Sequence, residues 1–376
     1  MQFLCNICQS ATISRRVLRD DGAGVLFCAN CGMGMIEEVP QKTDHFYDDG
    51  YYGDDTGDQA GYHDYSLTSA HTQAWVSLMV RALRPQGGRI LDVGCATGVL
   101  LSSLPANFKL FGIEVNGAAA AAASLHGITI LGSDIANPRL ANGDWGSFDV
   151  ITSIATFEHV LDFRGAVTTC LNSLAPDGVL VFEVPVISEI SHNRDWYGGS
   201  YEHIYYPTEQ GITHLFNSLG GVHWIGFENS IKGFSASYLG FATRSAETAA
   251  RADSLFKAMK NESLEGLNLE EKRLNLAYQV VHRFRPNPER ILALPDLFDV
   301  VASPPLLRHM TQLWYADAVG AAAAEAAGAT IEKAHNDNSL YMEARDFWRA
   351  QANAWEEAAK EAEASLRTLK AQSSNG

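Results

Sequence analysis

The chain has 376 residues, of which 46% are hydrophobic, enough for a packed core and for more than one domain. Its 44 acidic residues outnumber 28 basic ones and give a formal charge of −16, which argues against nucleic-acid binding because such binding needs a basic face. No apolar run reaches the ~18 residues of a membrane span, and the N-terminus does not read as a signal peptide, so we expect a cytoplasmic protein.

Residues 1–40 contain four cysteines with the spacing C-x2-C-x19-C-x2-C, namely Cys5, Cys8, Cys28 and Cys31. This spacing is typical of a four-thiolate zinc site in a ribbon. A closed shell of four ligands leaves no position for substrate, so the zinc is expected to be structural. Two disulfides are the alternative, which a reducing cytoplasm disfavours. Cys95 and Cys170 lie outside the pattern and are expected to be buried thiols.

Residues 41–68 are acidic, aromatic and rich in glycine, with neither a helical nor a strand period. Such a segment predicts an irregular lid or an exposed linker. From 69 to 84 an apolar stripe with helical spacing predicts a helix that packs on a sheet.

The segment 89–134 predicts a strand, a glycine loop with a helix start, and two acids downstream. The loop contains Gly94 and Gly98, and its backbone can approach a ligand closely. Glu114 ends the next strand, about twenty residues beyond the loop, where an acid can accept hydrogen bonds from both hydroxyls of a ribose. Asp134 follows the strand after that. The segment therefore predicts a nucleoside-containing cofactor.

The loop also distinguishes between cofactors. Its glycines lack the G-x-G-x-x-G register that a dinucleotide requires. Asp92, just before the loop, would repel a phosphate but can hold an ammonium group. This combination favours S-adenosylmethionine (SAM), which has a ribose, an adenine and an amino-acid tail but no phosphate.

The remaining strands alternate with helical stretches such as 117–125 and 164–174, which predicts a parallel, doubly wound α/β sheet. Two strands at 222–229 and 233–243 are expected to add an antiparallel edge pair. The strands of the parallel part are expected near 89–94, 109–115, 128–133, 148–154 and 178–184.

Successive stretches of this region resemble the motifs of class I SAM-dependent methyltransferases: LDVGCATG, Glu114, GSD at Asp134, FDVITSIATFEHV and LAPDGVLVFEVP. The resemblance spans roughly 70 to 245 and implies a seven-stranded methyltransferase domain at 69–245. It implies that Asp92, Gly94 and Gly98 surround the methionine part, that Glu114 binds the ribose, and that Asp134 and Ile135 meet the adenine. Cys95 and Val115 complete the expected cofactor-binding set. Ala96 departs from the family, which usually has glycine there.

With its cysteine ribbon, the chain is similar to bacterial sugar C-methyltransferases and to methyltransferases of surface-glycan clusters. In such enzymes a tyrosine-rich stretch after the ribbon folds over the cofactor, which makes Tyr47, Tyr51 and Tyr52 candidates for contact. The resemblance implies a small-molecule acceptor, a sugar that is most simply nucleotide-linked. The second Rossmann-like domain of those enzymes finds no counterpart in the sequence, so C- and O-methylation both stay open.

The segment 195–207, DWYGGSYEHIYYP, is the expected acceptor site because a loop after the fifth strand would overhang the methyl group. Aromatic side chains suit a sugar face, and a His–Glu pair suits proton abstraction. The sugar C-methyltransferases carry a similar cluster, which implies His203 as the base, Glu202 as its partner and Tyr201 as a substrate contact. A histidine that caps the following helix is the structural alternative.

Glu158 and His159 resemble part of a metal-binding set found in other methyltransferases, but Ala155 stands where that set has another glutamate. His159 is therefore expected to line the cofactor pocket. Residues 246–376 are expected to be helical, and an apolar stripe from Leu340 suits packing within the chain or between subunits of a homo-oligomer. The alternatives to a sugar enzyme are a methyltransferase of secondary metabolism and a non-catalytic scaffold.

Overall fold

The computed structural model describes residues 3–43, 46–47, 51–52, 73–136, 146–188, 199–231, 235–261 and 265–283. These residues all belong to the first of two compact units, Met1–Trp314 and Tyr315–Gly376. The stripe from Leu340, with its expected role in a homo-oligomer, lies outside them, as do Trp196 and Tyr197. Among the described helices, none has the length and apolar character needed to cross a membrane.

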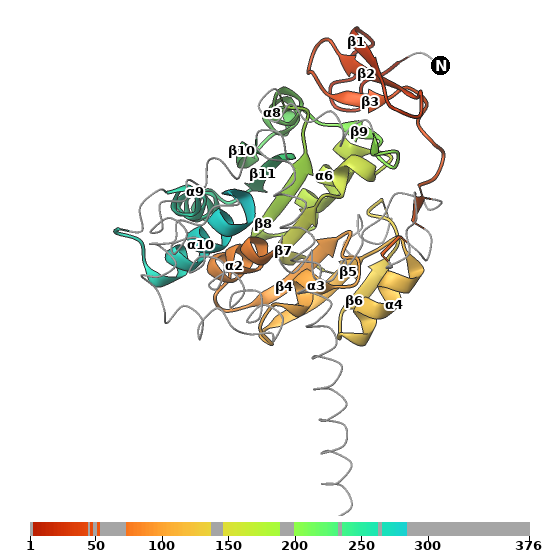
Figure 1. The fold of residues 1–376 in the computed structure, drawn as a ribbon. Helices are drawn as coiled ribbons and strands as arrows, with labels where there is room; N and C mark the ends of the chain where they lie inside the picture. Colours follow the sequence, from red (N-terminus) through yellow and green to blue (C-terminus); the bar gives the residue numbers. More distant parts are fainter. Residues whose placement is uncertain are drawn as a thin grey trace, which may run out of the picture. The chain divides into compact units, whose positions relative to one another are not determined.

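A seven-stranded sheet forms the centre of the first unit (Figure 1). In spatial order its strands are β10 (His223–Ile231), β11 (Ser235–Thr243), β8 (Leu174–Pro185), β7 (Phe148–Ile154), β4 (Gly88–Val93), β5 (Phe108–Ile113) and β6 (Thr129–Gly132). β8, β7, β4, β5 and β6 run parallel to one another, whereas β11 is antiparallel to both β8 and β10. The predicted doubly wound, mostly parallel sheet is confirmed, together with its antiparallel pair.

Helices cover both faces of the sheet. They are α2 (Ala74–Leu83), α3 (Val99–Ser102), α4 (Gly117–Leu125), α6 (Phe163–Asn172), α8 (Glu209–Ser218), α9 (Ala246–Lys260) and α10 (Leu269–Arg283), with the short 3-10 helix η2 (Phe157–His159). Polar side chains start several of them by accepting a hydrogen bond from a free amide of the first turn, as Asn116 does for α4 and Asp162 for α6. The helical character expected for 246–376 matches α9 and α10 as far as Arg283, and residues 284–376 lie outside the described part of the chain.

Alternation along the buried strands builds two hydrophobic cores. In β8, Leu180 and Phe182 point into one core with α6 and α8, while Val179 and Val181 point into the other. The second core is formed with α2, α9 and α10, which pack against one another (Figure 1). Because both faces of the central strands are covered, these strands read as continuous apolar runs in the sequence.

The N-terminal cysteine ribbon (residues 3–36) supplies three strands of a second sheet, and a short strand from much later in the chain supplies the fourth. Its strands are β1 (Ile13–Leu18), β2 (Gly24–Cys28), β3 (Gly34–Ile36) and β9 (Tyr205–Tyr206), in that spatial order and all antiparallel. Since β9 comes from the segment after β8, the ribbon is hydrogen-bonded directly to the region expected to hold the acceptor.

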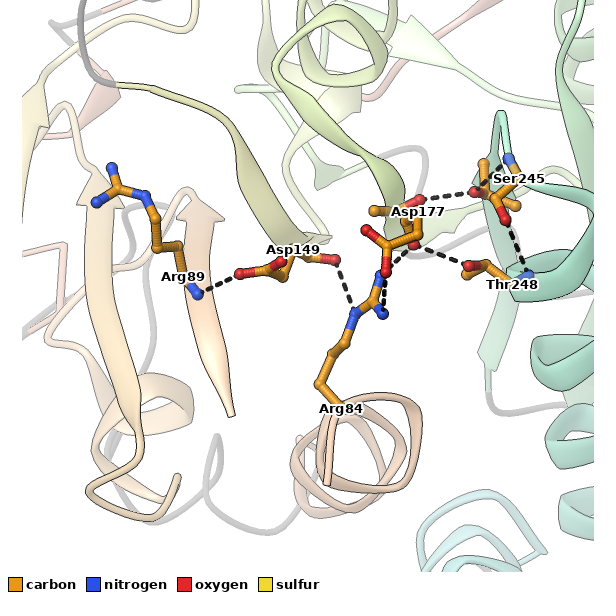
Figure 2. A network of polar contacts seen from close by, with 8 residues as sticks. Arg84, Arg89, Asp149, Asp177, Ser245 and Thr248 are labelled. Atoms are coloured by element: carbon orange, nitrogen blue, oxygen red, sulfur yellow. Dashed lines mark hydrogen bonds and ion pairs between the residues drawn. The ribbon is translucent and has the colours of Figure 1, made fainter. Parts of the chain in front are cut away.

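A polar network ties the elements together at the amino ends of the strands (Figure 2). Arg84, at the end of α2, donates to the Asp149 carbonyl in β7 at 3.4 Å and pairs with the Asp177 carboxylate in β8 at 3.0 Å. Thr248 in α9 donates to the Asp177 carbonyl at 2.8 Å, and Arg89 donates its amide to the Asp149 carboxylate at 2.7 Å. This network fixes the end of the sheet opposite the strand ends where ligands bind in such folds.

Candidate functional site

A cavity of about 770 Å³ lies at the carboxyl ends of the parallel strands. Its wall contains residues at or just after the ends of five strands: Val93 and Gly94 from β4, Ile113 to Val115 from β5, Ser133 to Ala136 from β6, Ile154 to Thr156 from β7, and Glu183 from β8. This is the edge of an open α/β sheet where ligands bind, because the loops diverge there and leave room.

The glycine loop after β4 turns sharply beside the cavity. Gly94 has φ +78°, and a Cβ at this position would collide with the side chain of Thr156. The amides of Gly94 and Cys95 donate to the Ile113 carbonyl at 2.9 and 3.1 Å, so the loop is anchored on β5. Ala96 takes φ +47°, a left-handed conformation in which a methyl group is strained. Gly94 can therefore bring bare backbone to a ligand.

Glu114 is a buried carboxylate on the cavity wall. One of its oxygens accepts from the Ala96 amide and the other from the Asn116 amide, each at 2.8 Å. Burial raises the pKa of Glu114, and these hydrogen bonds lower it only in part. Each carboxylate oxygen has a further lone pair, so Glu114 can still accept two hydrogen bonds from a ligand.

The other expected nucleoside contacts lie on the same wall. Val115, Asp134, Ile135 and His159 all line the cavity. The Asp134 carboxylate accepts from the Ala136 amide at 2.8 Å, which holds the turn after β6. Ile135 is almost completely buried and presents an apolar surface. The sheet thus brings together an acid and an apolar side chain beside Glu114.

Three of the expected cofactor residues are not in the cavity wall. Asp92 is buried in β4, where its carboxylate accepts from the Thr152 hydroxyl at 2.7 Å. Burial raises the pKa of Asp92 to about 7, and the neighbouring charge of Glu114 adds to the effect. Cys95 is buried, as is Cys170. Gly98 is the N-cap of α3 in a left-handed conformation.

The tyrosines before the sheet lie at the cavity. Tyr47, Tyr51 and Tyr52 all line it, and Tyr51 is only 3% exposed. Their rings contact edge to face, with centroids 4.8 Å apart for Tyr47 and Tyr51 and 4.9 Å apart for Tyr51 and Tyr52. Tyr47 also contacts the ring of His159, and its carbonyl accepts from the Asn116 side chain at 3.2 Å. The neighbouring residues 53–72 are outside the described part of the chain.

The predicted catalytic residues Tyr201, Glu202 and His203 are not among the described residues that line the cavity. His203 is buried behind His159, with ring centroids 4.6 Å apart. Burial lowers the pKa of His203 well below its usual value, and the charges of His159 and Arg19 act in the same direction. Tyr201 is 39% exposed and lies under the Arg19 guanidinium. The part of these residues in catalysis stays a prediction.

His159 faces the cavity and Glu158 lies behind it. The His159 Nε2 atom is 3.4 Å from the Glu158 carboxylate, which is 1% exposed. Burial is the largest single effect and opposes protonation of His159, but the charge and hydrogen bond of Glu158, together with Glu202, outweigh it and raise the pKa of His159. Atoms of Glu158, His159 and His203 lie within 4.8 Å of one another. The sequence placed His159 at the pocket but gave no sign of this cluster, because His203 comes from another part of the chain.

Glu183 is a cavity residue for which the sequence pattern predicts no role. It stands near the end of β8, where Ile154 of β7 pairs with it in the sheet. Burial raises the pKa of Glu183 to about 7. An acid in the run LVFEVP between buried apolar residues was the only sign available from the sequence.

The four ribbon cysteines come together in space. Their Sγ atoms lie within 4.8 Å of one another, with 3.5 Å between Cys5 and Cys31 and between Cys8 and Cys28. All four are free thiols rather than disulfides. Four thiolates around a zinc with Zn–S bonds of about 2.3 Å stand about 3.8 Å apart, so the donor set fits a tetrahedral ion closely.

The cysteine ribbon also contacts the cavity wall. Asn6, between the first two cysteines, donates to the Asp162 carboxylate at 2.8 Å and accepts from the Arg164 amide at 2.9 Å. Asp162 lines the cavity and caps α6. Arg19, between β1 and β2, donates to the carbonyls of Ser200 and Tyr201 at 3.3 and 3.0 Å. These bonds link the ribbon to the cavity wall at Asp162 and to the segment that contains Tyr201.

Residues 68–220 match the family model described as "Methyltransferase domain". Over 101 residues, 26% of this chain, the sequence is 40% identical to a ubiquinone biosynthesis O-methyltransferase of Nitrosococcus oceani and 36% identical to one of Ralstonia nicotianae. The chain spans less than half of these relatives, 43% and 42% of their length.

Among solved structures, the magnesium protoporphyrin IX methyltransferase of Synechocystis PCC 6803 with bound SAH is 16% identical and has a TM-score of 0.38. That likeness covers 50% of this chain and 89% of the other.

Proposed function

We propose that this chain, in which residues 68–220 match a methyltransferase domain, is a SAM-dependent methyltransferase that acts on a small molecule. The observation that carries the proposal is the cavity at the strand ends, where Gly94, Glu114 and Asp134 share one wall. Bound SAM would supply a methyl group on a positively charged sulfur. The residues of the chain would bind it, orient it against the acceptor and exclude water.

Each part of SAM has a suitable partner in this wall. The spare lone pairs of Glu114 suit the two hydroxyls of a ribose, and Asp134 with Ile135 suits the amino group and the face of an adenine. Gly94 offers backbone to the methionine part. The ammonium-binding role expected of Asp92 stays a prediction.

Calorimetric titration with SAM tests the proposal. We expect micromolar binding to the wild type and loss of measurable binding in Glu114→Ala, because two buried hydrogen-bond acceptors for the ribose disappear. Glu247→Gln, a matched loss of an exposed carboxylate on α9, should bind like the wild type. If the wild type gave no binding heat, the non-catalytic scaffold would be favoured instead.

For the acceptor we propose a sugar, most simply a nucleotide-linked one. The resemblance to sugar methyltransferases supports this choice. A phenol is the second candidate, favoured by relatives whose names specify O-methylation in ubiquinone biosynthesis.

Incubation with labelled SAM and two panels, nucleotide sugars and dihydroxybenzoates, separates the acceptors. We expect label transfer to a nucleotide sugar, and NMR of the product distinguishes a carbon from an oxygen attachment. Transfer to a phenol alone would overturn the sugar proposal while leaving the methyltransferase intact.

We also propose that the cysteine ribbon holds one structural zinc ion through Cys5, Cys8, Cys28 and Cys31. The close grouping of four free thiols supports this, and the ion would supply cross-linking rather than chemistry, because four protein ligands complete its shell.

A further inference from the structure

Strand order divides the cavity into a cofactor side and an acceptor side. The residues suited to a nucleoside follow β5 and β6, and the glycine loop follows β4. Adjacent strands are about 4.8 Å apart, so the end of β8 lies roughly 10 Å from β4, on the side away from the nucleoside. An acceptor that meets the methyl group from that side would lie against β7 and β8.

Glu183 is the carboxylate at this end of the cavity. It lines the wall together with Ala155, Thr156 and His159. Ala155 adopts φ +48° and donates its amide to the Glu183 carbonyl at 2.9 Å, so a strained turn is held against the end of β8. The neighbouring Ser237 hydroxyl of β11 acts on the pKa of Glu183 and lowers it.

His203, by contrast, is separated from the cavity. His159 lies between, with its ring 4.6 Å from that of His203, and its Nδ1 atom is 3.4 Å from the Glu202 carbonyl. A general base must come within hydrogen-bond distance of the proton that it removes. Of the two residues, Glu183 meets this requirement for a ligand in the cavity.

We propose that Glu183 is the general base of methyl transfer, accepting the proton of the attacking group of the acceptor. The inference rests on the proposed function, because it requires SAM in the same cavity. When the attacking group is a hydroxyl, a lone pair of its oxygen would form the new bond to the methyl carbon of SAM. The bond from carbon to sulfur breaks, its electron pair stays on sulfur, and the hydroxyl proton moves to Glu183, which later releases it to water.

The protonation chemistry of Glu183 fits this task at neutral pH. Burial raises the pKa of Glu183 to about 7, the Ser237 hydrogen bond opposes the rise, and the Glu158 charge adds to it. Among the described residues that line the cavity on this side, the other titratable groups are His159 and Asp162, and Glu158 lies behind His159. A base works best when its pKa lies near the working pH, because it is then both ionised and able to hold a proton.

Two measurements on the full-length protein test the inference. In the first, the protein carries a carbon label at the side-chain carboxyl of every glutamate and is saturated with S-adenosylhomocysteine. Carbon NMR then follows each glutamate through a pH titration, and Asp92 gives no signal because aspartate is not labelled. We expect a resonance that titrates between about pH 6 and 8 and is absent from Glu183→Gln. Turnover of the acceptor found in the panels should fall about 100-fold or more in Glu183→Gln, with unchanged affinity for S-adenosylhomocysteine.

Glu183→Asp and Glu247→Gln are the companion variants. Glu183→Asp keeps the carboxylate but shortens its reach, so part of the turnover should remain, whereas Glu247→Gln should match the wild type. A glutamate resonance near pH 7 that persists in Glu183→Gln, or turnover within about threefold of the wild type, would overturn the inference. Failure of the wild type to bind S-adenosylhomocysteine would instead overturn the proposed function, and the inference with it.

Discussion

Asp92 and Glu114 are two buried carboxylates whose negative charges act on each other at the ends of β4 and β5. Burial raises the pKa of both, and the Thr152 hydroxyl only partly compensates Asp92. Two such negative charges are unfavourable without a bound ligand and become favourable beside a cation. SAM carries positive charge on its sulfur and on its amino group, so the ligand would relieve a strain that the fold itself creates.

The raised pKa of Asp92 makes the stability of the fold depend on pH. Asp92 has a pKa of about 7 in the folded protein against 3.8 ordinarily. Between these two pH values the folded protein therefore keeps a proton on Asp92 that the unfolded chain has lost. Its stabilising contribution is complete below about pH 4 and is lost as the pH rises to about 7. Without ligand, Asp92→Asn should therefore be more stable than the wild type at pH 8, by a few kcal/mol at most, and similar at pH 4.

Denaturant unfolding of the ligand-free protein at both pH values measures this difference. Glu247→Gln, which changes an exposed carboxylate, should keep the pH dependence of the wild type. An unchanged pH slope in Asp92→Asn would show that the carboxylate is solvated or paired with a cation.

At the scale of elements, the segment 199–206 is positioned by the cysteine ribbon rather than by its own sequence. β9 pairs with β3, and Arg19 reaches across to the carbonyls of Ser200 and Tyr201 and to the Tyr206 hydroxyl. Asp21 holds the Arg19 guanidinium from the other side at 3.1 Å. A buried guanidinium with several acceptors stabilises more than an exposed pair, because its loss leaves those acceptors without donors.

Arg19→Ala should therefore loosen 199–206. We expect a loss of about 2–4 kcal/mol in unfolding free energy and faster hydrogen exchange at Tyr201 to Tyr206. Arg16→Ala in the same ribbon is the control, because the pair of Arg16 with Glu37 is largely exposed and should contribute about 0–1 kcal/mol. Equal effects of the two variants on exchange would contradict the positioning role of Arg19.

At the scale of the whole first unit, the cysteine ribbon and the sheet share one hydrophobic core. Cys5, Cys28 and Cys31 belong to the same buried cluster as Leu180 and Phe182 of β8. Asn6, beside the cysteines, holds the Asp162 carboxylate on the cavity wall. Loss of the ribbon structure would therefore disturb the cavity wall at Asp162, although the cysteines themselves do not line the cavity.

Removal of the proposed zinc ion should accordingly weaken SAM binding as well as stability. We expect about one zinc per chain by metal analysis, and a lower melting temperature with weaker SAM binding after chelation, because the proposed ion links both halves of the ribbon. Cys28→Ala should behave like the chelated protein, and Cys170→Ala, a buried thiol outside the set, should retain its zinc. Full SAM affinity in metal-free protein would refute the coupling.

The sequence by itself determined the parts of this protein that depend on local pattern. Apolar runs of strand length, helical stripes and the glycine loop predicted the seven strands β4 to β8, β10 and β11, and the positions of Glu114 and Asp134. Each of these features follows from neighbouring residues, because periodicity and turn chemistry act over a few positions. The same holds for the cysteine spacing, which predicted the cluster that the fold assembles.

Only the tertiary structure decided what long-range packing brings together. β11 inserts between β8 and β10, and β9 leaves the main sheet to join the ribbon. His203 lies behind His159, whereas Glu183, unremarkable within an apolar strand, is at the cavity. These placements depend on which strand ends meet, and no local period encodes that choice, because it results from the burial of whole faces against partners distant in the chain.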